Sequence, residues 1–321
     1  MRKKTRRPCH AIICFNSYRE VAMKFILTTA GALVFAATAS AQDRELTFEP
    51  TELRGGIVML TTGAGGNMGV LTGDDGILLV DDLLPGTGSQ VEAAIADIAG
   101  EGVPRFILNT HYHGDHTGSN DHFHAEGSTI VAHHNIRTRL AASDEQNAYG
   151  FLPVLTFGED IHFHMNGETV RAVHVPSAHT DGDALVYFET ADVLHMGDTL
   201  FSGLFPFIDL TGGGTVDGYL DAMETGLRIA GPETQVIPGH GPLSTREDIQ
   251  ASIDMVRAAR AIIAPLVEAG MSLEEVQAAN PLADFHDDWN WGFICTPRMV
   301  ATLYLDAAGD AETSPLATSC N

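Results

Sequence analysis

The chain has 321 residues, with 42 acidic against 18 basic side chains and a formal charge of −24 at pH 7. Such a charge repels nucleic acid and anionic lipid headgroups, because both are bound mainly through Lys and Arg contacts to phosphate. We therefore expect no nucleic-acid partner. The acidic surface by itself indicates no other partner.

The N-terminal residues 1–41 are expected to be a leader. Met23-Lys24 opens an apolar stretch, and Ala39-Ser40-Ala41 is a cleavage site of the small-x-small type. We predict a secretory signal peptide at 23–41, with Met23 as the true start and a cut before Gln42, and hence a periplasmic or secreted protein. The alternative is a membrane anchor, but the apolar stretch is shorter than the roughly 20 residues that span a bilayer. No membrane anchor is expected after cleavage.

The mature chain, residues 42–321, is long enough for one catalytic domain with a buried core. Without the leader's seven basic residues and one acidic residue it has 11 basic and 41 acidic residues, a formal charge of −30 and no lysine. Cys295 and Cys320 are its only cysteines, and export would expose them to an oxidising compartment. We predict a disulfide between them, the alternative being two separate thiols.

The first elements expected in the mature chain are three short strands joined by turns. Apolar runs bounded by Gly-rich and Asp-Gly turns predict strands at Ile57–Thr62, Met68–Leu71 and Ile77–Val80. The loop 63–67 lacks the Lys and Ser/Thr of a phosphate loop, so we interpret it as a hairpin tip that could flank a substrate. A helix is expected at about 90–99, with Ser89 and Glu92 as a capping box.

A cluster of four candidate metal ligands follows the apolar run Phe106–Leu108: His111, His113, Asp115 and His116. A strand places alternate side chains on one face, so His111 and His113 can point together into a cavity. Gly114 permits a sharp turn that can carry the other two to a second position. Imidazole and carboxylate groups suit zinc-like ions. The pattern H-x-H-x-D-H therefore predicts a two-metal site. The alternative interpretation is a polar loop after a buried strand, which would be favoured if only one isolated His were present.

The rest of the chain is strand-rich with helices interspersed, and it shows no obvious linker. Strands are expected near Thr129–Ala132, Ile161–Met165, Val170–Val175, Leu185–Phe188 and Val193–Met196. Helices are expected near 216–229, 246–264, 273–279 and 297–307. Their expected N-caps are Thr215, Thr245, Ser272 and Thr296, with Pro297 at a first helical position. This arrangement predicts a single domain.

Three later stretches each place a candidate ligand just past a strand: His179, Asp198 and His240. Each has a glycine or another small residue as a neighbour. With H-x-H-x-D-H, a later His, a Gly-Asp and a Gly-His in this order, the sequence resembles the metallo-β-lactamase superfamily over nearly the whole mature chain.

The resemblance implies an α/β fold, a four-layer αββα sandwich with metals at one edge between two sheets. It implies that His111, His113 and His179 bind a first zinc and that Asp115, His116 and His240 bind a second. Asp198 is implied as the bridging carboxylate, as in glyoxalase-type and lactonase-type members. Asp81 matches the superfamily's first motif and is expected to orient ligands by hydrogen bonding. Because many β-lactamases of the superfamily do not use a Gly-Asp bridge, the pattern indicates the broader hydrolase superfamily.

This ligand set predicts metal-dependent hydrolysis. Two Zn²⁺ per chain, with Fe or Mn as alternatives, can lower the pKa of bound water from 15.7 to about 7. Asp115 is expected to orient the nucleophile. We expect an exported binuclear zinc hydrolase that cleaves an amide or ester, with a β-lactam or lactone ring as the best guess. The alternatives are an iron-dependent oxidoreductase of the persulfide dioxygenase type, which needs one metal, and a metal-binding protein without catalysis.

Two aromatic stretches are candidates for the substrate pocket. Phe201–Gly214 follows Asp198, and Trp289, Trp291 and Phe293 lie near the C-terminus; both stretches could equally be core packing. No basic cluster is present to bind a phosphate or a carboxylate. We therefore expect a neutral or monoanionic small-molecule substrate.

Overall fold

The computed structural model describes residues 45–100, 102–142 and 152–320. The predicted leader and its signal peptide at 23–41 lie outside the described residues. Within the described part of the chain, no helix has both the length and the apolar content needed to cross a membrane.

The first sheet runs from β1 to β7 in the order of the sequence. β1 to β4 form the expected antiparallel meander, whereas β4, β5, β6 and β7 pair in parallel. The carboxyl ends of β4 and β5 therefore lie at the same edge. The strands are β1 (Glu49–Glu52), β2 (Ile57–Thr61), β3 (Met68–Leu71), β4 (Leu78–Val80), β5 (Phe106–Asn109), β6 (Thr129–His133) and β7 (Leu155–Phe157).

The second sheet has the order β12-β11-β10-β9-β8. Its strands are β8 (Asp160–Met165), β9 (Glu168–His174), β10 (Ala184–Phe188), β11 (Val193–His195) and β12 (Gln235–Ile237). β11 and β12 pair in parallel and the other neighbours are antiparallel. β9, β11 and β12 thus run in one direction, and the loops that follow them leave the sheet at one edge.

The core between the sheets is built from alternate residues of the strands. In β2, Ile57 belongs to the cluster between the sheets and Val58 to the cluster under the outer helices. In β10, Val186 belongs to the cluster between the sheets and Leu185 to the cluster under the helices of the second sheet. Since a strand directs successive side chains to opposite faces, strands covered on both faces read as continuous apolar runs.

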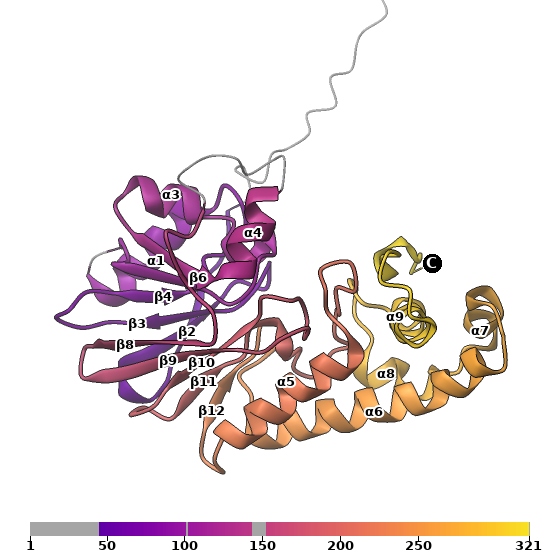
Figure 1. Cartoon of the computed structure of the whole chain (residues 1–321). Coiled ribbons are helices and arrows are strands. Elements are labelled where there is room, and N and C mark those ends of the chain that lie inside the picture. Colours follow the sequence, from indigo (N-terminus) through magenta and orange to yellow (C-terminus); the bar gives the residue numbers. More distant parts are fainter. Residues whose placement is uncertain (1–44, 101, 143–151, 321) are drawn as a thin grey trace, which may run out of the picture. The chain divides into compact units, whose positions relative to one another are not determined.

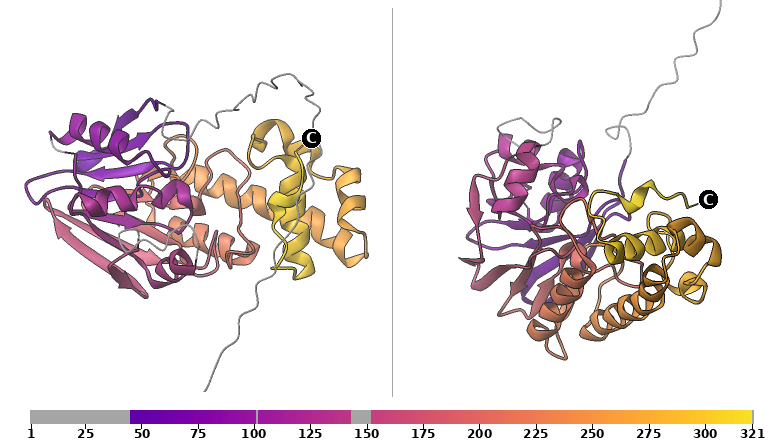
Figure 2. Two further views of the ribbon diagram at one scale, coloured as in Figure 1. Left: turned by 90° about the horizontal axis from the view of Figure 1, so that it is seen from above. Right: turned by 45° about the vertical axis from the view of Figure 1, so that its right-hand side comes forward.

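Helices cover the outer face of each sheet. α1 (Gly88–Ala99) and α3 (Asn120–Ala125) pack on the first sheet through Val91, Ile95 and Phe123. α5 (Val216–Ile229) and α6 (Arg246–Glu268) pack on the second, and α9 (Thr296–Ala308) packs against α6. Figure 1 shows the magenta and orange helices on opposite sides of the two sheets, and Figure 2 shows α9 beside α6. The expected αββα sandwich is confirmed. The other helices are α2 (Gly114–Thr117), α4 (His134–Ala142), α7 (Leu273–Ala279) and α8 (His286–Trp289).

Three of the predicted N-caps are confirmed. The Thr215 hydroxyl accepts a hydrogen bond from Gly218 N at the start of α5. Capping boxes of Thr245 with Asp248 and of Ser272 with Glu275 begin α6 and α7. These signals are local in sequence, which explains why they are readable without the fold.

Two predicted caps are wrong. α1 begins at Gly88 after Thr87, because the Thr87 carbonyl already accepts hydrogen bonds from the backbone of Gln90 and Val91; Ser89 therefore lies inside the first turn. α9 begins at Thr296 itself, with Cys295 as N-cap, and Thr296 N donates to the Asn290 side chain.

The C-terminal tail is tied to the start of α9 by a disulfide between Cys295 and Cys320, as predicted. Arg298 of α9 also holds the tail, because its Nε donates to the Thr318 carbonyl at 2.9 Å. The tail carries Leu316, which packs against the core of the second sheet.

Replacing Cys320 with serine is expected to lower the free energy of unfolding by about 3 kcal/mol, since the disulfide closes a loop of 25 residues in the unfolded chain. Denaturant unfolding of the variant and the wild type, with and without reductant, measures this. Reductant should bring the wild type to the stability of the variant and leave the variant unchanged. An oxidised wild type as unstable as the variant would contradict the prediction.

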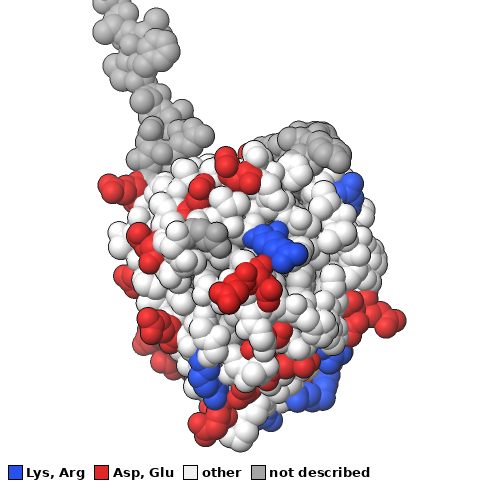
Figure 3. All heavy atoms as spheres, turned by 90° about the vertical axis from the view of Figure 1, so that its left-hand side faces the viewer, with Lys and Arg blue, Asp and Glu red and all other residues white. Residues whose placement is uncertain are grey.

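The surface carries far more acidic than basic groups. On the face shown in Figure 3, carboxylates are scattered over most of the surface, whereas Lys and Arg side chains form isolated spots. Several arginines of the described part are paired with carboxylates, as in Arg54 with Asp192 and Arg171 with Asp160.

Candidate metal centre

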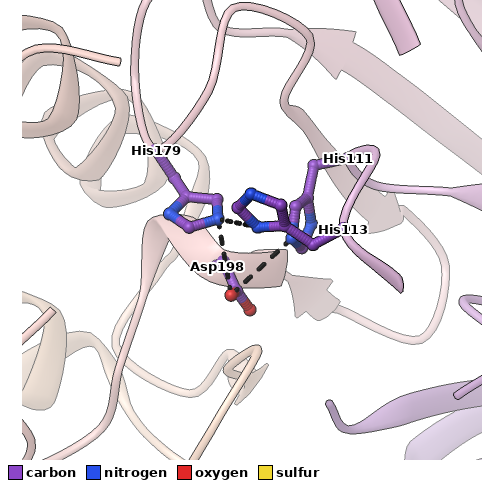
Figure 4. A group of neighbouring side chains, drawn as sticks. All are labelled: His111, His113, His179 and Asp198. Atoms are coloured by element: carbon purple, nitrogen blue, oxygen red, sulfur yellow. Dashed lines mark hydrogen bonds and ion pairs between the residues drawn. The ribbon is translucent and has the colours of Figure 1, made fainter. Parts of the chain in front are cut away.

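The first cluster of candidate ligands contains His111, His113, His179 and Asp198, whose ligand atoms all lie within 4.8 Å of one another. His111 and His113 follow β5, His179 lies in the loop after β9, and Asp198 lies in a short 3-10 turn after β11. Figure 4 shows the three imidazoles and the carboxylate pointing toward one another. The shared direction of these strands therefore brings together residues that are up to 87 positions apart in the sequence.

The second cluster contains Asp115, His116 and His240, again with ligand atoms within 4.8 Å of one another. His113 is the extended residue before α2, and Gly114 begins that single turn, so Asp115 and His116 leave in a different direction from the preceding histidines. His240 follows β12. The turn expected at Gly114 is thus present.

Asp198 lies between the two clusters and is only 3% exposed. Its carboxylate oxygens are 3.7 Å from His111 Nε2 and 3.5 Å from His179 Nε2. They are also 3.1 Å from His116 Nε2 and 3.4 Å from His240 Nε2. The structure therefore brings all seven predicted ligands together, in the grouping that the resemblance implied. Their role as metal ligands stays a prediction.

Two glycines allow the backbone to pack directly against these side chains. A Cβ atom on Gly66 would lie 2.1 Å from His116 Cε1, and one on Gly239 would lie 2.0 Å from Asp198 Oδ1. Any side chain at either position would displace a candidate ligand. The glycine-rich loop after β2 thus forms part of the centre's wall as well as a hairpin tip.

In four of the five candidate histidines, the ring nitrogen that faces away from the centre contacts a hydrogen-bond partner. These contacts fix the ring orientation and leave the other nitrogen directed at the centre. They are Thr110 Oγ1 to His111 Nδ1 at 3.1 Å, Asp209 Oδ2 to His113 Nε2 at 3.0 Å, Asp81 Oδ2 to His116 Nδ1 at 2.7 Å and Phe207 O to His179 Nδ1 at 2.7 Å. Asp81 therefore orients His116, as expected from the sequence.

Three buried atoms that face the centre have no hydrogen-bond partner: His111 Nε2, His116 Nε2 and Asp198 Oδ1. An unsatisfied buried polar group costs about 1–3 kcal/mol. His116 Nε2 is 3.1 Å from Asp198 Oδ1, but the pair lacks hydrogen-bond geometry. Divalent cations would satisfy all three atoms, and imidazole and carboxylate donors suit zinc. The residues present therefore fit a pair of metal ions.

The two clusters differ in their electrostatics. Burial, reinforced by the neighbouring imidazoles, holds the pKa of His111 well below its usual value, and burial lowers the pKa of His179 to about 4. Burial also acts to lower the pKa of His116 and His240, but the neighbouring carboxylates, led by Asp198, together outweigh it. The pKa of His116 is consequently raised well above its usual value and that of His240 to about 9. Metal binding at the second cluster would displace protons.

Asp209 is a functional residue that the sequence did not single out. Its Oδ2 atom accepts hydrogen bonds from His113 Nε2 and from the Tyr112 hydroxyl, at 3.0 and 2.5 Å, and its Oδ1 atom accepts from Thr211 and from Gly212 N. It lies in the long loop between β11 and α5, far in sequence from His113. A lone Asp between Ile208 and Leu210 was the available signal, and it is weak.

Replacing Asp209 with asparagine is expected to weaken metal binding by about 10–100-fold, because the amide cannot accept all four of these hydrogen bonds and His113 loses its fixed orientation. Titration of the metal-depleted protein with Zn²⁺ measures this. Tyr112→Phe is the matched control, since it removes one donor to Asp209 and leaves the His113 contact in place. Equal effects of the two changes would contradict the orienting role.

A cavity of about 720 Å³ opens beside the centre. Its floor includes His113, Asp115, Asp198 and His240, and its walls include Gly63 and Gly65 of the hairpin loop. Aromatic wall residues come from both stretches expected as candidates: Phe201, Phe207, Trp291 and Phe293. The C-terminal tail adds Ser314 and Leu316.

Trp289, another of the aromatic candidates, lies outside the cavity lining. Trp289 packs against the core of the second sheet. His195 is a buried core histidine whose two ring nitrogens contact Asn67 O at 3.2 Å and Gly197 N at 3.1 Å.

The fold has two stacked sheets with helices on the outside, and a cluster of His and Asp side chains lies where the carboxyl ends of the strands meet. These features define a class of metal-binding α/β sandwich proteins. The family profile described as the metallo-beta-lactamase superfamily matches residues 61–245. The chain belongs to the metallo-beta-lactamase superfamily.

Similar proteins differ in their activities. The alpha subunit of 2,4-dinitroanisole O-demethylase from Nocardioides sp. strain JS1661 is 25% identical over 71% of this chain and 68% of its own length. Hydroxyacylglutathione hydrolase from Methylococcus capsulatus is 37% identical over 30% of this chain; the match spans 34% of that relative's length. A metallo-beta-lactamase from Pontibacter korlensis shares the fold, with a TM-score of 0.57 and 17% identity over 66% of this chain and 99% of its own.

Proposed function

We propose that this chain is an exported binuclear zinc hydrolase that cleaves an amide or ester bond, with a β-lactam or lactone ring as the first candidates. The observation that carries the proposal is the position of Asp198, whose carboxylate lies within 3.7 Å of histidines from both clusters. One carboxylate placed this way suits two metal ions held close together. Superfamily membership and hydrolase relatives support the reaction class.

The candidate residues have different roles in the proposed hydrolysis. His111, His113 and His179 would hold one ion, Asp115, His116 and His240 the other, and Asp198 both. When bound, such ions supply an activated water and polarise a carbonyl. Asp115 is 28% exposed in its side chain and lines the cavity, so it can accept a hydrogen bond from the attacking water and orient it. The substrate is a small molecule, neutral or monoanionic.

Metal analysis of the purified protein beside a hydrolysis screen tests this function. The screen uses nitrocefin, simple lactones, thioesters and aryl esters, before and after metal removal by chelation. About two zinc ions per chain with chelator-sensitive turnover is the expected result. One iron ion with oxygen uptake would instead support an oxidoreductase of the persulfide dioxygenase type. Bound metal without turnover would support a binding protein.

Export has its own test. Mass analysis of the protein's N-terminus is expected to show that the chain begins at Gln42. A retained leader would remove the export part of the proposal and leave the chemistry untouched.

A further inference from the structure

The cavity beside the metal centre has no Lys or Arg among its described lining residues. The composition of the chain explains much of this, because all three lysines precede residue 25. The undescribed positions beyond residue 44, which are 101, 143–151 and 321, contain neither Lys nor Arg. Beyond residue 44, any cation near the cavity would therefore have to be an arginine of the described part.

Two arginines that lie close to cavity residues are already engaged. Arg139 makes a bidentate ion pair with Asp181 at 2.6 and 2.8 Å, and its guanidinium lies over the Tyr112 ring. Arg298 donates to the backbone carbonyls of Phe293 and Thr318. Neither guanidinium lines the cavity. A carboxylate on a substrate would thus lack the bidentate partner that usually binds such a group.

An aromatic wall, formed by Phe207, Trp291 and Phe293, runs from the centre to the cavity mouth. The Phe207 ring is stacked on His113 with 5.6 Å between centroids. Phe293 meets Phe207 edge to face at 5.6 Å and Trp291 at 5.7 Å. Phe293 is 42% exposed although it is a large apolar residue. The wall therefore offers continuous apolar area for a ligand to cover.

Apart from the histidines of the candidate centre, the charged groups among the described lining residues are carboxylates. Asp115 and Asp198 belong to the candidate centre, and Asp209 already accepts four hydrogen bonds. An anionic group placed along the aromatic wall would lose hydration and find no guanidinium among the described lining residues. Arg298 lies 5.9 Å from the centre of the Phe293 ring, but it already donates to backbone carbonyls.

We propose that the cavity selects neutral esters or lactones that carry an aromatic or aliphatic group along the aromatic wall, and that it discriminates against carboxylate-bearing β-lactams and glutathione thioesters. This inference rests on the proposed hydrolase function and narrows its substrate class. The scissile carbonyl would lie at the floor of the cavity beside Asp115 and His240, with the apolar group extending toward Phe293.

A pair of esters matched in size tests the charge preference: phenyl acetate and 4-carboxyphenyl acetate, hydrolysed by the metal-loaded protein. After each rate is divided by that of the hydroxide-catalysed reaction, the neutral ester should have a kcat/KM at least about tenfold higher. Phe293→Arg places a cation at the mouth and should shrink this ratio. Nitrocefin, a carboxylate-bearing β-lactam, should be a poor substrate of the wild type.

The aromatic wall is tested with a larger neutral ester. Phe293→Ala should lower kcat/KM for 2-naphthyl acetate about tenfold, mainly through KM, while phenyl acetate is less affected. Ile262→Ala is the matched control, because Ile262 is also an exposed apolar residue, at 38%, but lies on α6 outside the cavity.

The outcomes separate this inference from the function on which it rests. Metal-dependent hydrolysis that favours the carboxylate ester or nitrocefin, or that Phe293→Ala does not alter, would overturn the inference and leave the hydrolase function standing. No metal-dependent hydrolysis of any ester, lactone or β-lactam would overturn both.

Discussion

Replacing Asp198 with alanine is expected to reduce hydrolysis by about 10³-fold or more and to lower the metal content of the purified protein. The side chain is buried and contacts histidines of both clusters at 3.1 to 3.7 Å. Its removal takes away the one carboxylate shared by the two clusters and leaves several imidazole nitrogens facing each other without an anion. Metal analysis and kcat/KM on the best substrate of the screen measure the two effects.

Asp192→Ala is the matched control for Asp198. Asp192 is also an aspartate that follows a strand of the second sheet, and it accepts hydrogen bonds from Tyr187 and Thr234, but it belongs to neither cluster. Its variant should lose stability and keep wild-type metal content. An Asp198→Ala protein with full metal content and full activity would show that the proposed centre is misassigned.

Asp115→Ala is expected to lower kcat by roughly 10²–10³-fold while the first cluster keeps its metal. Asp115 is partly exposed to the cavity, as His113 is, whereas His111 and His116 are fully buried. The same carboxylate can therefore contact both a metal ion and the attacking water. Single-turnover rates together with metal stoichiometry separate loss of chemistry from loss of metal.

Asp115→Asn refines this test, because the amide keeps an oxygen that can accept a hydrogen bond but cannot take up a proton at neutral pH. Activity between those of the wild type and Asp115→Ala would assign part of the effect to orientation. Asp121→Ala, which removes an exposed aspartate from α3, is the control for a change in surface charge. Full activity and full metal content in Asp115→Ala would refute its assigned role.

The strands that carry the centre were predictable because their signal is local. Ile57–Thr61, Met68–Leu71 and Phe106–Asn109 are short apolar runs that are buried on both faces, so their composition alone distinguishes them from turns. β1 and β7 were missed because they lie at the two edges of their sheet: every residue of β1 is exposed, and only Phe157 of β7 is buried. An edge strand is held by pairing with its neighbour, which a local hydrophobic pattern does not record.

The candidate ligands were readable for a related reason. Each of His179, Asp198 and His240 follows a strand and stands beside a small residue, and each of these features lies within a few positions of the ligand. The disulfide was readable because only Cys295 and Cys320 follow the predicted leader. What the ligands do together depends on parallel strands meeting at one edge, which the superfamily resemblance supplied and the local pattern did not.

The sequence by itself determined the types and order of the candidate ligands, the acidic charge and the strand pattern, because these depend on residues close together in the chain. Only the tertiary structure decided that Asp209 orients His113, that Phe293 and Leu316 wall the cavity while Trp289 joins the core, and that no described Arg reaches the lining. Those properties arise where segments far apart in sequence pack against one another. The proposed reaction class therefore rests on local motifs, and the proposed substrate preference rests on packing.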